Sequence, residues 1–213
     1  MGEIVLVRHG QANTTARDEA SYDALSDLGR TQSQFVGAFL RDQGEAFDQV
    51  VSGDLNRQRN TAEEMGFVPE IDTRLNEMDY FNLAEALRQH KGVALPGSTD
   101  FADHAPKLVA AWHEGEIMGN ETFASFETRV ASVLKEAATP GRRVLCVTSG
   151  GVVSMMLRQL LGLDPVAMAN VLLPIYNTSI HRIHVRPHGI YLAGFNAVPH
   201  LEDPDRHSMK THY

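Results

Sequence analysis

The chain has 213 residues, of which 43% are hydrophobic and 22% are charged, and its length is typical of one globular domain. This composition excludes collagen, a coiled coil and an intrinsically disordered chain. Nineteen Lys and Arg against 27 Asp and Glu give a formal net charge of −8, which argues against nucleic acid or an anionic membrane as a partner. The single cysteine, Cys146, excludes an internal disulfide framework.

The first residues lack the pattern of a targeting segment. Glu3 stands where a signal peptide has its basic region, and the apolar run over residues 4–7 is short. No window approaches the roughly 18 apolar residues of a membrane span. We therefore expect a cytoplasmic protein with no membrane partner and with Cys146 reduced and buried.

The first element is predicted over residues 4–7. This apolar, mostly β-branched run is typical of a strand that is buried on both faces. A loop is expected over about 10–25. Ser26 is then a candidate N-cap for a helix with apolar residues at helical spacing, and Gly44 is a plausible end for that helix.

A second strand is predicted over 47–51, ending at Ser52. Either Ser52 or Asp54 is expected to cap the next helix, which runs to about Met65. Residues 78–120 are rich in Gly and Pro and show little periodicity. We interpret them as an inserted cap or lid with short helices, in which Trp112 anchors the segment by packing.

The second half of the chain repeats the pattern of helix and strand. Apolar spacing from Phe123 to Leu134 predicts an amphipathic helix, and residues 144–147 predict a third buried strand. A further helix follows, with Met155 and Met156 in the core. Residues 178–186 and 190–195 are predicted as two more strands, and the polar tail after about Leu201 is expected to be irregular.

Alternating apolar strands and helices favour an α/β fold with a mainly parallel sheet, formed by one domain over residues 1–213. Ligands of such sheets bind at the carboxyl ends of the strands. Three polar segments fall at these ends: Arg8-His9-Gly10, Ser52, and Thr148-Ser149-Gly150-Gly151.

Arg8, His9 and Gly10 together suit phosphoryl chemistry. Neutral imidazole is a nucleophile at pH 7 and can carry a phosphoryl group. Gly lets backbone N–H groups approach an anion, and the planar fork of Arg matches phosphate oxygens. A surface histidine beside an ion-paired arginine is the competing interpretation of the tripeptide alone.

The order and spacing of several motifs resemble the histidine phosphatase superfamily, also called the phosphoglycerate mutase-like family. The resemblance covers most of the chain except 78–120 and the tail. It is carried by Leu6-Val7-Arg8-His9-Gly10-Gln11, Leu25-Ser26-Asp27-Leu28-Gly29-Arg30, Ser52-Gly53-Asp54-Leu55-Asn56-Arg57, Thr61-Ala62-Glu63, Leu75-Asn76-Glu77, Glu121-Thr122-Phe123, Ser149-Gly150-Gly151-Val152, Asn177-Thr178-Ser179 and Phe195-Asn196.

The resemblance implies a fold, an activity and residue roles. The expected fold is a three-layer αβα sandwich, and no cofactor or metal is implied. His9 is similar to the nucleophile that becomes phosphohistidine, and Arg8 and Arg57 to the arginines that hold the phosphoryl group. Glu77 is similar to the general acid, with Asp79 as its rival. Arg59 has no family role and is expected on the surface.

Ser149 departs from the family pattern, which has a second histidine just before the Gly-Gly pair. A serine hydroxyl donates a neutral hydrogen bond in place of a charged one. This difference is worth about 1–2 kcal/mol, or roughly a 10- to 30-fold loss in rate per step. Three outcomes stay open: Ser149 works with the N–H groups of Gly150 and Gly151, a histidine from elsewhere enters, or catalysis is lost and phosphate binding is kept.

A second departure lies in the loop after Gly10. Many family members have Asn where this chain has Thr15, and nearby Asn13 is a candidate substitute as a phosphate ligand. Thr-Ser-Gly-Gly and Arg-His-Gly-Gln-Ala are also similar to the motifs of some branches of the superfamily, which favours a site designed around serine.

The other histidines are weaker candidates. His90, His104 and His113 lie in the cap, where any of them can replace the missing histidine, although a solvated surface position is the simpler interpretation. The histidines at 181, 184 and 188 lie in the region of the last predicted strands. His181 and His184 are three residues apart, so on a strand they face opposite sides, which argues against a metal site. The three near the tail, at 200, 207 and 212, are expected on the surface.

These observations predict a phosphomonoester hydrolase that acts on a small phosphorylated substrate. The predicted site comprises His9 and Glu77 as catalytic residues, with phosphate bound by Arg8, Arg57, Ser149, Gly150 and Asn13. Two alternatives stay open: a mutase-type phosphoryl transfer, or a non-catalytic protein that binds a phosphorylated ligand. The sequence does not predict the oligomeric state.

Overall fold

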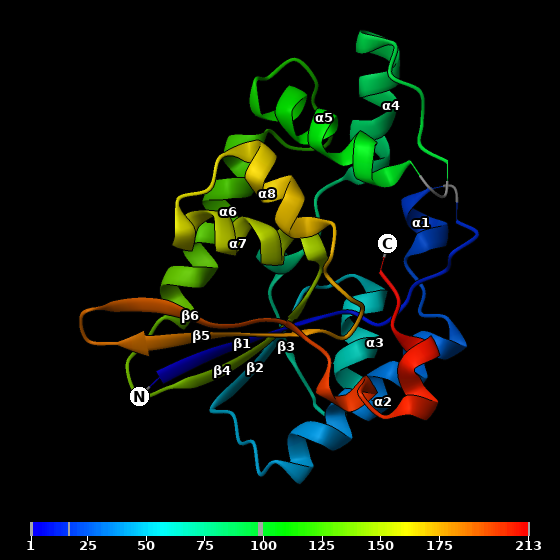
Figure 1. Cartoon of the computed structure of the whole chain (residues 1–213). Coiled ribbons are helices and arrows are strands. Elements are labelled where there is room, and N and C mark those ends of the chain that lie inside the picture. The colour runs from blue at the N-terminus through cyan, green and yellow to red at the C-terminus, as the bar shows by residue number, and fades with distance from the viewer. Residues whose placement is uncertain (1, 17, 98–99, 213) are drawn as a thin grey trace.

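The computed structural model describes residues 2–16, 18–97 and 100–212. Within these ranges the strands form one sheet in the order β3-β2-β4-β1-β5-β6 (Figure 1). The four neighbours at one side, β3 (Glu70–Ile71), β2 (Gln49–Ser52), β4 (Arg143–Thr148) and β1 (Gly2–Arg8), run parallel. At the other side β5 (Ile180–Arg186) and β6 (Gly189–Ala197) form an antiparallel hairpin that pairs with β1. The predicted, mainly parallel α/β sheet is confirmed.

Strand β1 lies in the middle of the sheet and is buried on both faces. Because successive side chains of a strand point to opposite faces, Ile4 and Leu6 join one core cluster while Val5 and Val7 join the other. The parallel register pairs Arg8 with Thr148, and the His9 N–H donates to the Thr148 carbonyl at 2.8 Å. The polar residues after β1 and β4 therefore emerge side by side.

Helices cover both faces of the sheet, as in the expected three-layer sandwich (Figure 1). Helices α2 (Asp27–Asp42) and α3 (Asn56–Glu64) pack on the Val5 and Val7 side. On the opposite face lie α6 (Phe123–Ala137), α7 (Gly150–Leu161) and α8 (Pro165–Leu172). Cys146, Met155 and Met156 are buried in this second core, as predicted.

The ends of α2 and α3 are set in different ways. Ser26 is the predicted N-cap of α2, and its Oγ accepts from the Gly29 N–H at 3.0 Å. The prediction that Ser52 or Asp54 caps α3 is wrong, because the N-cap is Leu55, which forms no side-chain cap bond. Instead, the Asp23 carboxylate accepts from the first N–H groups of α3, at 2.9 and 3.0 Å. A residue that lies before α2, far from α3 in the sequence, thus satisfies these N–H groups.

Residues 78–120, called the cap below, contain α4 (Tyr80–Lys91) and α5 (Phe101–His113), which form the upper part of Figure 1. These helices have 12 and 13 residues and are longer than the irregular pattern suggested, and Pro106 lies inside α5. Trp112 is 2% exposed and packs on Phe123 and Phe126 at ring-centroid distances of 5.2 and 5.4 Å. The predicted packing role of Trp112 is confirmed.

The short elements α1 (Glu19–Tyr22), η1 (Thr73–Leu75), η2 (Pro199–Leu201) and η3 (Pro204–Met209) complete the described fold. The prediction of an irregular tail is wrong, because η3 is a 3₁₀ helix and the segment after it packs back on the molecule. The Thr211 Oγ1 donates to Asn177 Oδ1 at 2.9 Å, and the Asn177 N–H donates to the Thr211 carbonyl at 2.8 Å. None of the helices in the described ranges is both long and apolar enough to cross a bilayer.

Candidate active site

His9 follows β1 directly and is only 2% exposed. Its Nδ1 lies 2.7 Å from the Gly10 carbonyl oxygen. Because a carbonyl only accepts, Nδ1 carries the proton and Nε2 keeps its lone pair. Burial, followed by the positive charges of Arg57 and Arg8, holds the pKa of His9 well below 6.5. The ring is therefore a neutral imidazole with an unprotonated Nε2, which is the form that a nucleophile needs.

Arg57 lies in the first turn of α3 and has no exposed side-chain surface. Its Nη1 donates to Glu19 at 2.6 Å and to Asp23 at 3.2 Å, and its guanidinium lies 4.9 Å from the centre of the Tyr22 ring. The carboxylates of α1 and the loop after it thus balance a buried cation. Burial is the largest single influence and lowers the pKa of Arg57, but the nearby acidic groups, led by Glu19, together outweigh burial and raise that pKa.

The two predicted arginines leave several buried N–H groups unpaired. Nε and Nη2 of Arg57 and Nε of Arg8 have no hydrogen-bond partner within the described residues. Arg8 is 7% exposed, and its Nη1 donates to the Ile175 carbonyl, which fixes the side chain. Unpaired buried donors are costly and rare in folded proteins. Three such donors beside a neutral imidazole form an arrangement that an anion would satisfy.

Gly150 lies at the start of α7, between Leu172 and Arg8. A Cβ on Gly150 would come within 2.9 Å of Leu172 Cδ1 and 3.7 Å of the Arg8 Nε, so a larger residue would crowd this point. Gly150 and Arg8 both line the cavity described below. The N-terminus of a twelve-residue helix is therefore brought next to the guanidinium, in agreement with the predicted placement of Gly150.

Glu77 follows η1 and bridges to α7. One carboxylate oxygen accepts from the Met78 N–H and the other from the Gly151 N–H, both at 3.0 Å. The N–H of Gly151, which the sequence suggested for phosphate, is thus occupied by Glu77. The rival Asp79 accepts instead from the Asn120 N–H and the Asn82 amide, at 3.1 and 2.8 Å, on the side of the cap. Glu77 lines the cavity, whereas Asp79 is not among its lining residues.

Ser149 is fully buried at the N-cap position of α7, and its partner is Gln58. The Gln58 Nε2 lies 2.7 Å from the Ser149 Oγ and 3.0 Å from the Leu75 carbonyl oxygen. Because the carbonyl only accepts, this end of the amide is the NH₂ group, and Ser149 must accept from it. The Ser149 hydroxyl proton therefore stays available for a further acceptor. Gln58, also fully buried, carried no sequence signal for this role.

A cavity of about 510 Å³ lies beside these groups, and the buried His9 and Ser149 are not among the described residues that line it. Its base is lined by Arg8, Arg57, Glu77 and Gly150. Glu19 and Tyr22 of α1 form one side, and both were missed by the sequence analysis because the loop over 10–25 shows no periodicity. The remaining described residues that line the cavity are Gln11, Ala12, Asn13, Thr14, Ala16, Met78, Tyr80, Phe81, Pro96, Gly97, Phe101, Leu172 and Asn177.

Asn13 lines the cavity, but its amide is used within the loop. Its Nδ2 donates to the Ser21 carbonyl at 2.9 Å, and its Oδ1 accepts from the N–H and hydroxyl of Thr15 at 3.1 and 2.8 Å. One Nδ2 hydrogen is used by Ser21, and the second can donate to a phosphate. Asn13 thus stabilises the loop next to α1, whose residues Glu19 and Tyr22 form one side of the cavity.

The cap histidines do not line the cavity. His90 and His113 are exposed, as the simpler interpretation expected, but His104 is only 3% exposed, so a solvated position is wrong for it. Its Nδ1 lies 3.2 Å from the Tyr80 hydroxyl, and the Tyr80 ring does line the cavity. His104 therefore does not contact the cavity itself, and instead bonds to Tyr80, which does.

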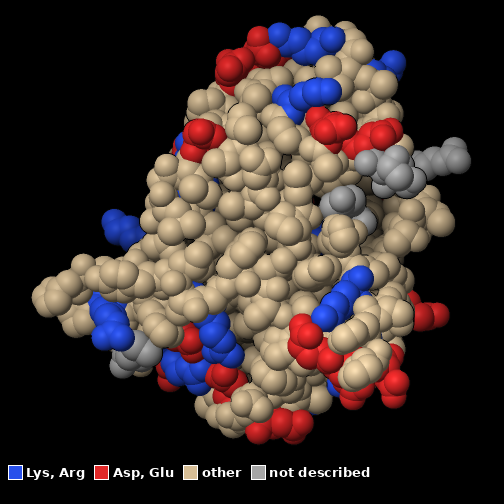
Figure 2. Space-filling model, in the orientation of Figure 1, with Lys and Arg blue, Asp and Glu red and all other residues tan. Residues whose placement is uncertain are grey.

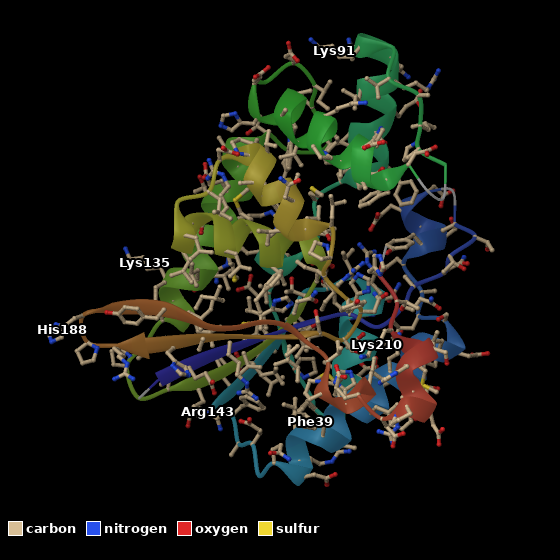
Figure 3. The ribbon with its side chains drawn as sticks, in the orientation of Figure 1. Phe39, Lys91, Lys135, Arg143, His188 and Lys210 are labelled. Carbon is tan, nitrogen blue, oxygen red and sulfur yellow. The ribbon has the colours of Figure 1, made fainter. Side chains whose placement is uncertain are left out.

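The histidines outside the cap lie in varied places. His188 stands at the exposed tip of the β5–β6 hairpin (Figure 3). The surface position expected for His200 is wrong, because it is 4% exposed and its Nε2 lies 2.9 Å from the Thr178 hydroxyl. Across the described ranges, no three His, Cys, Asp or Glu side chains are grouped to hold a metal ion.

Comparison with known proteins bears on the family and the fold of the chain. The model of the histidine phosphatase superfamily (branch 1) matches residues 4–198. The mitochondrial serine/threonine-protein phosphatase Pgam5 of Drosophila willistoni is 25% identical over 206 residues, which cover 93% of this chain. The chain spans 65% of the length of that relative.

Solved structures share the fold. A phosphoserine phosphatase of Entamoeba histolytica, solved as a mutant with phosphoserine, superposes with a TM-score of 0.70 at 19% identity, over 94% of this chain and all of that one. A mycobacterial glucosyl-3-phosphoglycerate phosphatase, solved with VO₃, gives a TM-score of 0.63 at 26% identity, over 92% of this chain and 98% of the other.

Proposed function

The chain belongs to the histidine phosphatase superfamily, and from this membership we propose that it hydrolyses phosphomonoesters through a phosphohistidine on His9. The observation that carries the proposal is the set of unpaired buried N–H groups of Arg8 and Arg57 around a neutral His9. A phosphoryl group supplies the acceptors that these donors lack, and it brings phosphorus to the free lone pair of Nε2.

In the first step, His9 Nε2 attacks phosphorus in line with the ester oxygen. The P–N bond forms as the P–O bond to the alcohol breaks. The leaving oxygen takes a proton from the Glu77 carboxyl group, which lies on the cavity side of α7. The guanidinium groups hold the equatorial oxygens and stabilise the charge that develops on them.

In the second step, a water molecule attacks the phosphorus of phosphohistidine. The Glu77 carboxylate takes a proton from that water, the P–N bond breaks, and inorganic phosphate leaves with His9 neutral again. Ser149 donates its hydroxyl proton to a phosphoryl oxygen in both steps, because Gln58 already fills its acceptor side. The relatives and neighbours that carry phosphatase names support this hydrolytic outcome over transfer to a second substrate site.

The test is to trap the intermediate with p-nitrophenyl phosphate, quench the reaction and map the bound phosphate. We expect phosphate on His9 that is labile in acid and stable in alkali, together with release of inorganic phosphate. His9→Ala should lower the rate by a thousandfold or more. His90→Ala, a change at an exposed cap histidine, is the matched control and should keep the rate.

Two outcomes would favour the alternatives. Phosphate that moves quantitatively to an added alcohol, with no inorganic phosphate released, would indicate a mutase. Tight binding of inorganic phosphate with no label on His9 and no turnover would indicate a protein that only binds phosphorylated ligands.

A further inference from the structure

The wall of the cavity above the reacting groups is made of aromatic rings in contact with one another. The Tyr22 ring lies 6.3 Å from the His9 ring and 5.9 Å from Phe81. Tyr80 continues the series, at 5.9 Å from Phe81 and 5.3 Å from Phe101. All four of these rings line the cavity. Tyr22 comes from α1 and the other three from the cap, so a row of rings leads from His9 to the outer cavity.

Apolar side chains fill the spaces beside the row. Met78 and Leu172 are buried, at 4% and 8% exposed, and line the cavity together with Pro96. Such a surface binds the part of a ligand that loses little on leaving water. The ester group must lie at the base with its phosphorus near His9, so the apolar wall is left for the alcohol part of the substrate.

The charges around the cavity favour an uncharged alcohol part. Among the described lining residues, Arg8 and Arg57 are the cations, and both point at the place assigned to the phosphoryl group. The acidic lining residues are Glu19, which pairs with Arg57, and Glu77, the proposed proton donor, and neither offers a positive charge to a second anion.

No charged residue of the cap is among the described residues that line the cavity. Lys91 stands at the upper end of the cap, where it pairs with Glu116 at 2.6 Å (Figure 3). Over the face drawn in Figure 2, charged residues gather mainly toward the upper and lower edges, and the surface between them is mostly uncharged. His104, behind Tyr80, adds no cation at neutral pH, because burial lowers its pKa below 6.5.

We propose that the cavity selects phosphomonoesters whose alcohol part is an uncharged aromatic or similarly sized apolar group, and disfavours substrates with a second anionic group. The proposal rests on the proposed function, because that function places the phosphoryl group at His9. It deepens that function by naming the chemical class of the substrate.

The first experiment measures binding with phosphonates, which cannot be hydrolysed. Methylphosphonate, benzylphosphonate and 4-carboxybenzylphosphonate are titrated into the protein by calorimetry at pH 7.5. Burial of a phenyl ring predicts that benzylphosphonate binds roughly tenfold to a hundredfold more tightly than methylphosphonate. The added carboxylate should cancel most of that gain. Equal binding of the first two ligands, or tighter binding of the carboxylated one, would overturn the proposal.

Variants locate the effect in the wall. Phe101→Ala should lower the affinity for benzylphosphonate by about tenfold and leave methylphosphonate unchanged, which also shows that the variant is folded. Phe81→Arg should reverse the order of the two benzyl ligands, because it adds the missing cation. Tyr191→Ala, at a half-exposed ring on β6, is the control and should change neither affinity.

Turnover then separates the two proposals. Benzyl phosphate and 4-carboxybenzyl phosphate have leaving alcohols of similar acidity, so their kcat/KM values report binding. Equal kcat/KM with phosphohistidine formed would overturn the substrate class and leave the proposed function in place. No turnover of either ester, with benzylphosphonate still preferred, would overturn the proposed function and leave the selectivity of the cavity.

Discussion

The base of the cavity and the cap are built in opposite ways. The base is polar, and the buried His9 and Ser149 lie beside it. The parallel pairing of two adjacent strands places both of them, and the His9 N–H bonds to the Thr148 carbonyl at 2.8 Å. The cap lies outside the sheet and contributes rings and apolar side chains from two helices. The strand register fixes the relative positions of backbone atoms at the base, whereas the cap contributes mainly side-chain surface.

This difference suggests a division of labour. Reacting groups need the fixed geometry of strand ends, because misplacement by about 1 Å is costly in rate. Selectivity for an apolar group needs only area and shape, which a loosely specified segment can supply. Changes at the base should therefore lower kcat, and changes in the cap should act mainly on KM.

The largest effect is expected for Arg57→Lys. Lysine keeps the charge but loses the planar fork that pairs with Glu19 and leaves two N–H groups for the phosphoryl group. We expect kcat/KM for p-nitrophenyl phosphate to fall by about 10²- to 10³-fold, mainly through kcat. Arg59→Ala is the matched control two residues along α3, where the side chain is exposed and its Nη2 donates to Asn56. If Arg59→Ala lowered kcat/KM as much as Arg57→Lys does, the loss would not be specific to the base of the cavity.

A smaller effect is expected at Ser149, and it depends on Gln58. Both side chains are fully buried and in contact, so the larger ring in Ser149→His has no space while Gln58 is present. We expect Ser149→His alone to lower kcat/KM by about tenfold. Gln58→Ala added to it should restore activity to at least the level of the parent chain, as measured by steady-state kinetics. Increased turnover in Ser149→His alone would show that the serine limits the rate and that Gln58 does not obstruct the ring.

The pH dependence should report the neutral state of His9. Because its pKa is lowered below 6.5, the neutral nucleophile persists as the pH falls through 6.5, and kcat/KM should show no acid limb at that value. The change Arg57→Gln removes one of the charges that lower the pKa, so the acid limb of the residual activity should move upward. An acid limb at 6.5 in the parent enzyme would contradict the buried, neutral histidine.

The stability of the fold should also depend on pH, because another buried histidine has a lowered pKa. Burial lowers the pKa of His200 to about 4, so between pH 6.5 and about 4 the unfolded chain binds a proton that the folded chain does not. The free energy of unfolding should therefore decrease as the pH falls through this window, by up to about 1.4 kcal/mol per pH unit for one such group. Denaturant melts of His200→Asn should show a shallower decrease than the parent chain.

The smallest effect is expected for Tyr80→Phe in the cap. The change keeps the ring and removes the hydroxyl that bonds with His104 Nδ1 at 3.2 Å. We expect KM for benzyl phosphate to change by less than about threefold and kcat to stay constant, because one neutral hydrogen bond away from the reacting atoms is lost. A large loss of kcat would show that a cap residue takes part in the reaction, and would contradict the assignment of kcat effects to the base alone.

The positions of the residues near the base could be predicted from the sequence, because each follows a short pattern of neighbouring residues. Arg8, His9 and Ser149 each follow an apolar run that marks a buried strand, and strand ends of a parallel sheet meet at one edge. The N-cap residue of α2, Ser26, is predicted from an equally local pattern, because its hydroxyl bonds to the N–H of a residue three positions later.

The missed residues depend on contacts between distant parts of the chain. Glu19 and Asp23 reach Arg57 across 38 and 34 residues from a loop without periodicity, and Gln58 meets Ser149 across 91. The tail was expected to be irregular because its residues are polar, yet Thr211 completes the hydrogen bonds of Asn177 beside the cavity. Polar partners of this kind leave no spacing pattern in a single sequence.

The two acidic side chains in the cavity have one more consequence. Glu19 bonds to Arg57, and Glu77 bonds to the Gly151 N–H, so groups suited to a phosphoryl ligand already hold carboxylates when the site is empty. An incoming anion meets the unpaired N–H groups of Arg8 and Arg57, but the neighbouring carboxylate of Glu19 partly cancels the positive charge that attracts it. Inorganic phosphate, the smallest anion formed in the proposed reaction, gains nothing from the aromatic wall to offset this cancellation. If the proposed function holds, inorganic phosphate should therefore be a weaker inhibitor than a phosphonate of similar charge that also contacts the wall.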